Sequence, residues 1–126
     1  HNFTASSGNT FKIALFTSDA SLGAGTTAYS TSNEISNTSG SAYSAGGATL
    51  TSVTPVLDSS TAVCDFADVS YTSATFTANG ALIYNDDQSD KAVAVIAFGS
   101  DKTVTSGTFT IQFPTADASN AIIRLA

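Results

Sequence analysis

The chain has 126 residues, a length that fits one domain, and only 11% of them are charged. A net charge of −6 and four dispersed basic residues exclude the clustered Lys and Arg that bind nucleic acid or an anionic membrane. No run approaches the roughly 18 apolar residues of a transmembrane helix. Ser, Thr and Ala make up close to half of the chain, so hydroxyl groups rather than charges must keep it soluble.

The first predicted strand runs from Phe11 to Thr17 and is apolar on both faces. From Ser18 to Gly47 the chain is rich in Ser, Thr, Gly and Asn. We expect a long excursion here, with at most short strands near 28–30 and 33–36. Exposed loops of this kind often carry binding residues. Its isolated apolar side chains are therefore the predicted partner contacts: Leu22, Tyr29, Ile35 and Tyr43.

Two further strands are predicted at 48–57 and 62–69. Pro55 removes a backbone donor from the first of them and predicts an edge or a bulge. Cys64 is the only cysteine, which excludes an internal disulfide, and its strand-like context favours an inert, packed thiol. The segment 73–84 contains Asn79-Gly80, which is either a hairpin turn or a bulge in one longer strand. The short flanking segments favour the bulge.

The stretch from Ala81 to Pro114 has the clearest strand pattern. Its run 91–98 (KAVAVIAF) is apolar on both faces and predicts a central strand. A turn is expected at Gly99–Lys102, followed by an alternating strand at 108–113 and a last strand at 121–125. About eight short strands with turns between them predict an all-β fold. The expected architecture is one antiparallel β-sandwich domain over residues 1–126, jelly-roll-like or Greek-key.

Residues that support catalysis are scarce. The single histidine, His1, stands at the first position, where it is poorly held for a Ser-His-Asp or Cys-His arrangement, and one His with one Cys cannot complete a zinc site. Nothing marks two of the acidic residues as the partners that glycoside hydrolysis requires. The sequence therefore predicts a protein that is not an enzyme and has no cofactor.

The polar segment 85–90 (NDDQSD) concentrates three carboxylates: Asp86, Asp87 and Asp90. Ca²⁺ takes six to eight oxygen ligands, and this segment offers several. Its spacing departs from that of an EF-hand loop, however. A solvated turn that ends two strands and blunts edge pairing explains the same residues, and this interpretation is preferred. The three residues are thus only weak metal candidates.

The chain resembles small virion structural proteins of tailed bacteriophages in four stretches that cover nearly its whole length: FKIALFTSDASLGAGTTAYSTSNE, YSAGGATLTSVTP, ALIYNDDQSDKAVAVIAFGSDKTVTSGTFTIQFP and DASNAIIRLA. The resemblance transfers no catalytic residue. It implies a virion location after assembly in the bacterial host cytoplasm. It implies above all a capsid decoration (cement) protein that stabilises the head shell by binding the major capsid protein or other virion proteins. It also implies a short further segment ahead of His1.

Two alternatives stay open. One is a tail, fibre or adaptor component of the same particle. The other is a carbohydrate-binding or calcium-dependent adhesion module. Because small β modules on shells assemble around symmetry axes, we expect a homo-oligomer, most simply a homo-trimer.

Overall fold

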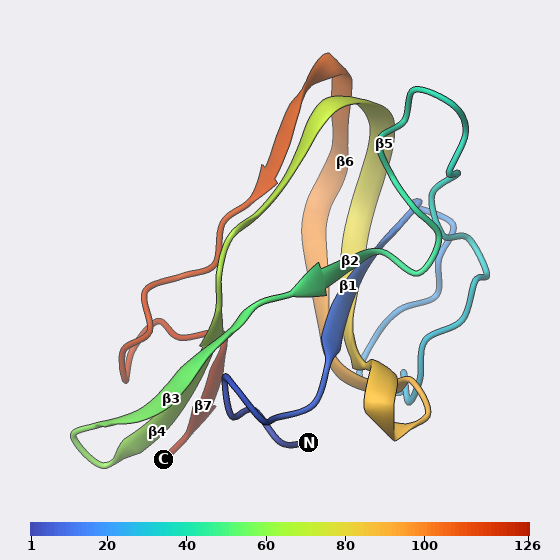
Figure 1. The fold of residues 1–126 in the computed structure, drawn as a ribbon. Coiled ribbons are helices and arrows are strands. Elements are labelled where there is room, and N and C mark those ends of the chain that lie inside the picture. Colours follow the sequence, from blue (N-terminus) through green and yellow to red (C-terminus); the bar gives the residue numbers. More distant parts are fainter.

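The computed structural model describes residues 1–126 and consists of seven strands and one short 3-10 helix (Figure 1). The elements in chain order are β1 (Phe11–Phe16), β2 (Ala48–Leu50), β3 (Ser52–Asp58), β4 (Thr61–Phe66), β5 (Val69–Asn85), η1 (Asp86–Gln88), β6 (Lys91–Ile111) and β7 (Ile123–Leu125). All pairings are antiparallel, in one sheet of order β2-β1-β5-β6 and a second of order β3-β4-β7. The predicted all-β, sandwich-like class is confirmed. None of the protein's helical segments has the length and apolar character needed to cross a membrane.

β5 and β6 form one long hairpin of 17 and 21 residues, where the sequence predicted several short strands. The register is interrupted in the middle. Ala78 pairs with Lys102 while Gly80 pairs with Ala97, so one residue of β5 lies opposite four residues of β6. Both strands turn over at this point, and the far half of the hairpin folds back over the core (Figure 1). This corner replaces the tight turns that separate the layers in a sandwich of short strands.

The expectations for this hairpin are partly met. The bulge at Asn79-Gly80 is confirmed. The turn expected at Gly99–Lys102 is wrong, because these residues form the wide side of the bulge inside β6. The run 91–98 is also wrongly predicted as a central strand: β5 is the only strand that pairs with β6, which forms the edge of its sheet. Its apolar character on both faces has another cause, since the excursion covers one face and the core covers the other.

The main core lies between the inner face of the four-stranded sheet and the folded-back half of the hairpin. β1 contributes Phe11, Ile13 and Leu15, all without exposed surface, and β5 contributes Tyr71 and Phe76 from the opposite layer. A smaller cluster lies on the outer face of the same sheet and consists of Ala14, Phe16, Leu82 and Tyr84. Because burial of one large apolar side chain stabilises by about 1.5–3 kcal/mol, β1 anchors both layers of the fold.

The small sheet extends from one end of the body, where the β3–β4 hairpin projects and both chain termini lie (Figure 1). β3 is its edge strand, and the register shifts between Val53 and Val56, on either side of Pro55. The edge and the bulge expected at this proline are confirmed. Cys64 in β4 is half-buried, and burial raises the pKa of its thiol, which disfavours the reactive thiolate.

Candidate functional site

One carboxylate fixes the excursion to the sheet. Glu34 forms an isolated bridge with Phe16 at the end of β1. Its side chain accepts hydrogen bonds from the Tyr29 hydroxyl at 2.7 Å, the Tyr43 hydroxyl at 2.5 Å and the Gly46 N–H at 2.7 Å. Hydrogen bonds to an ionised acceptor are shorter and stronger than neutral ones. We call these four residues, Tyr29, Glu34, Tyr43 and Gly46, the Glu34 clasp.

Tyrosine contacts join the clasp to the strands. The Tyr43 hydroxyl also accepts the N–H of Leu15 in β1 at 3.0 Å. Tyr84 in β5 donates to the Gly46 carbonyl at 2.7 Å, and its ring stacks on Tyr29 with the centroids 4.6 Å apart. Only the folded chain brings these groups together. The bonded side chains stand at irregular spacings in a segment without periodicity, so no sequence motif predicts their contacts.

The tyrosines around the clasp resist ionisation. Burial, and second to it the hydrogen bond to Glu34, raises the pKa of both Tyr29 and Tyr43. Burial also raises the pKa of Tyr71 to about 12 and that of Tyr84 to about 12. These hydroxyls therefore stay protonated at neutral pH, and those of Tyr29, Tyr43 and Tyr84 act as donors. The geometry describes a structural clasp rather than an acid–base pair.

An open cleft of about 720 Å³ lies beside the clasp, within the part of the excursion between residues 20 and 33. No acidic, basic or histidine side chain lines it. The cleft can offer hydroxyl hydrogen bonds and apolar contact, but it has no group for general acid or base catalysis. Its larger or polar lining residues are Phe16, Ser21, Leu22, Thr26, Thr27, Ser30, Ser32 and Asn33.

The four predicted partner contacts lie in different environments. Ile35 and Tyr43 are only 5% and 4% exposed and belong to the main core, so they hold the excursion down and cannot reach a partner. Tyr29 is half-buried in the clasp, beside Tyr84. Only Leu22 lines the cleft. The role of the excursion in binding stays a prediction, with Leu22 as the one of the four that a partner could touch there.

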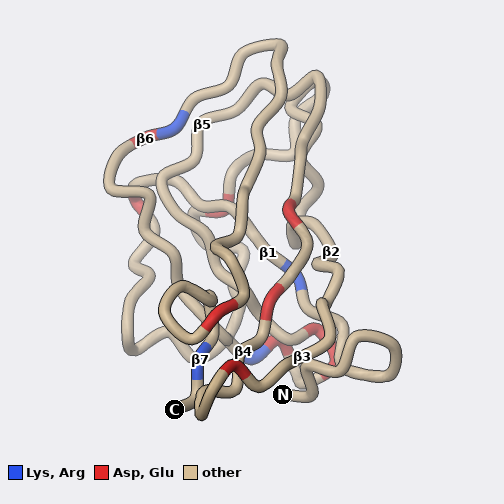
Figure 2. Tube along the Cα trace, turned by 90° about the vertical axis from the view of Figure 1, so that its left-hand side faces the viewer, with Lys and Arg blue, Asp and Glu red and all other residues tan.

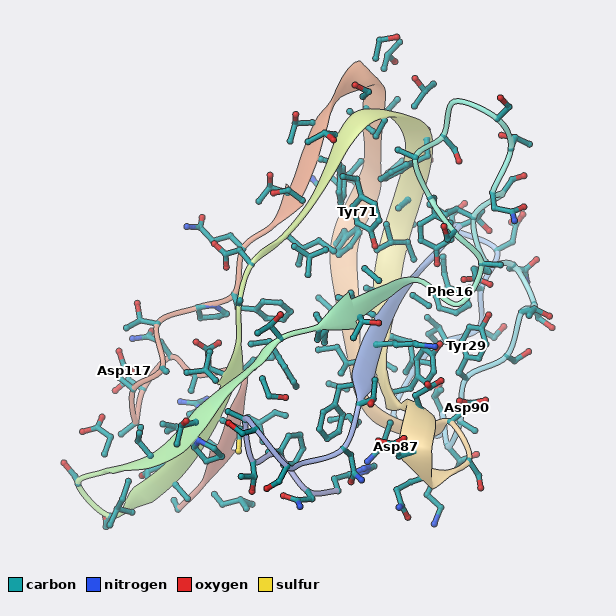
Figure 3. The ribbon with its side chains drawn as sticks, in the orientation of Figure 1. Phe16, Tyr29, Tyr71, Asp87, Asp90 and Asp117 are labelled. Carbon is teal, nitrogen blue, oxygen red and sulfur yellow. The ribbon has the colours of Figure 1, made fainter.

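The acidic turn at 85–90 forms bonds that hold neighbouring segments of the fold together. Asp86 pairs with Lys12 at 3.0 Å, and Asp87 accepts the N–H of Thr10 at 2.6 Å, so both tie the start of β1 to the end of the hairpin. Asp87 lies in η1 and Asp90 just after it, while Asp117 lies on the far side of the molecule (Figure 3). No three His, Cys, Asp or Glu side chains gather closely enough to share a metal ion. These bonds agree with a strand-ending turn.

The single histidine is held by an amide. The Nδ1 atom of His1 lies 2.9 Å from the side-chain nitrogen of Asn85, a fully buried residue that also donates to Asn9. A catalytic histidine needs a nucleophile on one side and an orienting carboxylate on the other. His1 has no hydrogen bond to either kind of group.

Two apolar surfaces remain open. On the small sheet, Leu57 and Leu125 flank Ala62 in register, and they are 71% and 72% exposed. The second surface is a groove of about 520 Å³ between the two halves of β6, where the sandwich is open. Uncovered apolar surface of this kind marks sites of interaction. The large apolar residues of the groove are Ile96, Phe98, Phe109, Ile111, Phe113 and Ile122.

Charge does not mark a nucleic-acid surface. The four basic residues are separated along the trace (Figure 2). Lys12 pairs with Asp86, and Arg124 donates to backbone carbonyls of Ala118 and Ser119. The chain matches no protein-family model, no curated protein and no solved structure. The geometry offers a hydroxyl-lined cleft and two apolar contact surfaces.

Proposed function

We propose that the chain is a non-enzymatic structural protein of a bacteriophage virion and that it binds the head shell as a decoration protein. One observation carries the proposal: the clasp carboxylate and its tyrosines are used in internal bonds, while apolar strand surfaces are left open. An active site needs polar groups that converge on a cavity and are free to contact a substrate. A protein that works by attachment needs a stiff scaffold and uncovered contact surface.

The scaffold suits a particle surface. Its long hairpin is paired on both sides of the corner, and its core draws on every layer of the fold. Cross-strand hydroxyl pairs cover the exposed face of the hairpin, between Ser70 and Thr110 at 3.0 Å and between Thr77 and Thr103 at 2.8 Å. Such pairs stabilise a sheet without adding charge. The resemblance of the chain to phage virion proteins supplies the particle to which this scaffold would attach.

The row of Leu57, Ala62 and Leu125 is the surface we assign to the shell. It lies on the small sheet at the end of the molecule that carries both termini (Figure 1). A flat apolar row on projecting strands can settle on a neighbouring subunit without rearrangement of the core. The major capsid protein is the proposed partner, and copies would be grouped around a symmetry axis of the shell, most simply in threes.

Copy number tests the proposal. Gel densitometry of purified particles should find the chain in hundreds of copies, and cryo-electron microscopy should place it on expanded heads. A handful of copies at one vertex or on the tail would overturn the decoration role and favour a tail, fibre or adaptor component. Absence of the chain from purified particles would overturn the virion role altogether.

A paired-variant experiment tests the assigned surface. Leu57→Ser with Leu125→Ser should abolish binding to expanded heads that lack the protein, and it should leave the melting temperature nearly unchanged because both side chains are exposed. Thr72→Ala with Thr108→Ala, on the exposed hairpin, is the matched control and should bind normally. Binding by the leucine variant at the wild-type level would contradict the assignment.

The adhesion alternative has its own test, because a ligand that binds only the folded state raises the melting temperature. Calcium at millimolar concentration should leave the melting curve where it is. A clear upward shift that Asp86→Asn with Asp90→Asn abolishes would instead favour a calcium-dependent module.

A further inference from the structure

The groove between the two halves of β6 has the size and lining of a small-ligand site. Its volume of about 520 Å³ falls within the range of about 300–1,000 Å³ that is usual for ligand pockets, which are also mostly apolar. Phe98 from the first half of β6 and Phe109 from the second both line it, with ring centroids 6.4 Å apart. Both rings pack against the main core and remain only partly buried, so one side of each is open to a ligand.

One charged side chain lines this groove, and it belongs to Lys102. In the hairpin, Lys102 pairs in register with Ala78 of β5, which has no exposed surface. Residues directly opposite each other in an antiparallel pair project from the same face of the sheet. Lys102 therefore projects from the core-facing side of β6, at the corner where its two halves meet. A lysine placed there can lay its apolar stem along the groove and keep its ammonium at the rim.

The Lys102 ammonium has no carboxylate partner in the chain, although the chain contains ten acidic residues. The adjacent Asp101 accepts a hydrogen bond from the side-chain nitrogen of Asn79 at 2.9 Å. The ammonium itself donates only to the Ser100 hydroxyl at 3.1 Å. Because an ammonium has three donors and a hydroxyl carries no charge, Lys102 keeps both unused donors and an uncompensated positive charge.

The remaining polar side chains of the lining, Thr110 and Gln112, are neutral, and the Thr110 hydroxyl already pairs with Ser70 at 3.0 Å. The groove thus offers apolar surface and a single cation. Charge complementarity selects an occupant with an apolar body and one negative head group. A second copy of the chain fits poorly, because it would bring another Lys102 to the same groove and a net charge of −6. An anionic bilayer fits poorly for the same net charge.

We propose that this groove binds a free long-chain carboxylate. The hydrocarbon chain lies along Phe98 and Phe109, and the carboxylate bonds to the Lys102 ammonium at the corner of β6. Burial of the hydrocarbon chain supplies most of the affinity, and the ion pair sets the direction in which the ligand lies. The groove is separate from the apolar row on the small sheet that we assign to the shell. Failure of one assignment therefore leaves the other untouched.

Calorimetry with dodecanoate tests the chemistry of the ligand. The wild-type chain should bind one dodecanoate per chain, and decanoate should bind at least fivefold more weakly because it buries fewer methylene groups. Lys102→Gln should weaken dodecanoate binding about fivefold, the upper end for an ion pair in contact with water. Lys91→Gln is the matched control: it removes the same charge from the same strand outside the groove, and it should change the dissociation constant less than twofold.

NMR spectroscopy tests the place of binding. When dodecanoate is added to the wild-type chain, the largest amide shift changes should fall within 96–98 and 109–113, with small changes at Leu57 and Leu125. Phe98→Gln should weaken binding at least tenfold, because it replaces an apolar wall of the groove by an amide. Leu57→Gln makes the same kind of change at an exposed site on the small sheet and should bind normally.

Four results would overturn the proposal. One is the absence of binding at about 1 mM dodecanoate, the weakest affinity expected for a ligand of this size. Another is an unchanged dissociation constant for Lys102→Gln, which would leave this lysine as protection of a strand edge. The third is a set of shift changes that is largest on the small sheet. The last is a dependence of the groove shifts on protein concentration without ligand, which would mean that a second copy covers the groove.

Discussion

β1 and β6 have similar sequences and different positions. Both combine a lysine at or near the start with a run that is apolar on both faces. In β1, every residue except Lys12 is buried, and β2 and β5 cover its two edges. In β6, no side chain is fully buried and one edge is open. The two strands show that an apolar sequence pattern predicts whether the faces of a strand are covered. It does not predict whether the edges of the strand are paired.

The difference arises from contacts distant in sequence. β2 reaches β1 only after the whole excursion, and the Glu34 clasp then holds that excursion against the sheet. The same excursion touches β6 at its first residues and leaves the edge there. Substitutions at matched positions of β1 and β6 therefore measure how much the covering segments contribute to the stability of each strand.

The largest expected difference between β1 and β6 is the loss of stability when an apolar side chain is truncated. Leu15→Ala in β1 should lower the free energy of unfolding by about 4 kcal/mol, because the side chain is fully buried and its removal leaves a cavity. Ile96→Ala in β6 should cost only about 1.5 kcal/mol, since the side chain is half-exposed in the groove. Urea denaturation at low protein concentration measures both values. Equal losses would mean that the β6 edge is covered in the isolated chain.

A pair of glycines gives the next contrast. Gly47 and Gly99 have similar positive φ angles of 82° and 79°. A Cβ atom at Gly47 would lie 1.9 Å from the carbonyl oxygen of Ile13 in β1, whereas one at Gly99 would meet nothing within 4 Å. Gly47→Ala should therefore cost about 3 kcal/mol, as overpacking against fixed backbone does. Gly99→Ala should cost about 1 kcal/mol, from backbone strain alone. Thermal melting distinguishes them, and similar melting temperatures would contradict a tightly covered β1.

Local chemistry made part of this fold predictable. Alternation and turn residues identified β1, the bulge at Asn79-Gly80 and the edge at Pro55, because each depends on the preferences of adjacent residues. The continuity of β6 was missed because Gly99–Lys102 have the composition of a turn, and only the pairing with β5 makes them a bulge. The Glu34 clasp was missed for a related reason: its geometry exists only after the excursion has folded over the sheet.

The clasp should contribute less than the core. Tyr43→Phe leaves the Leu15 N–H without its partner and leaves Glu34 Oε1 with the Gly46 N–H as its one donor, and it should cost about 2 kcal/mol because the site is buried. Tyr29→Phe is the matched control: the same carboxylate loses a donor, but water can replace it at this half-buried position, so about 1 kcal/mol is expected. Urea denaturation measures both. A larger loss for Tyr29→Phe than for Tyr43→Phe would contradict the ranking by burial.

Alkaline pH should destabilise the fold through its buried tyrosines. Burial raises the pKa of Tyr71 and Tyr84 to about 12, and raises the pKa of Tyr29 and Tyr43 as well. The folded state thus holds these protons more tightly than the unfolded state, whose tyrosines titrate near about 10. Their stabilisation is complete below about pH 10 and is lost as the pH rises toward about 12. Absorbance at 295 nm with denaturation at each pH measures the effect. Constant stability across this range would contradict it.

The smallest expected effect concerns the one charged side chain of β1. Lys12 pairs with Asp86 at 3.0 Å, but the two side chains are 29% and 37% exposed. Ion pairs in contact with solvent contribute little, so Lys12→Ala should cost about 0.5 kcal/mol, and the difference should vanish in 1 M salt, where the Debye length is about 3 Å. Lys91→Ala at the start of β6 removes a lysine without such a pair and should change the free energy of unfolding even less. A loss above 1 kcal/mol for Lys12→Ala would mean that charge helps to position β1, whereas the structure assigns that role to burial and to the segments that cover its edges.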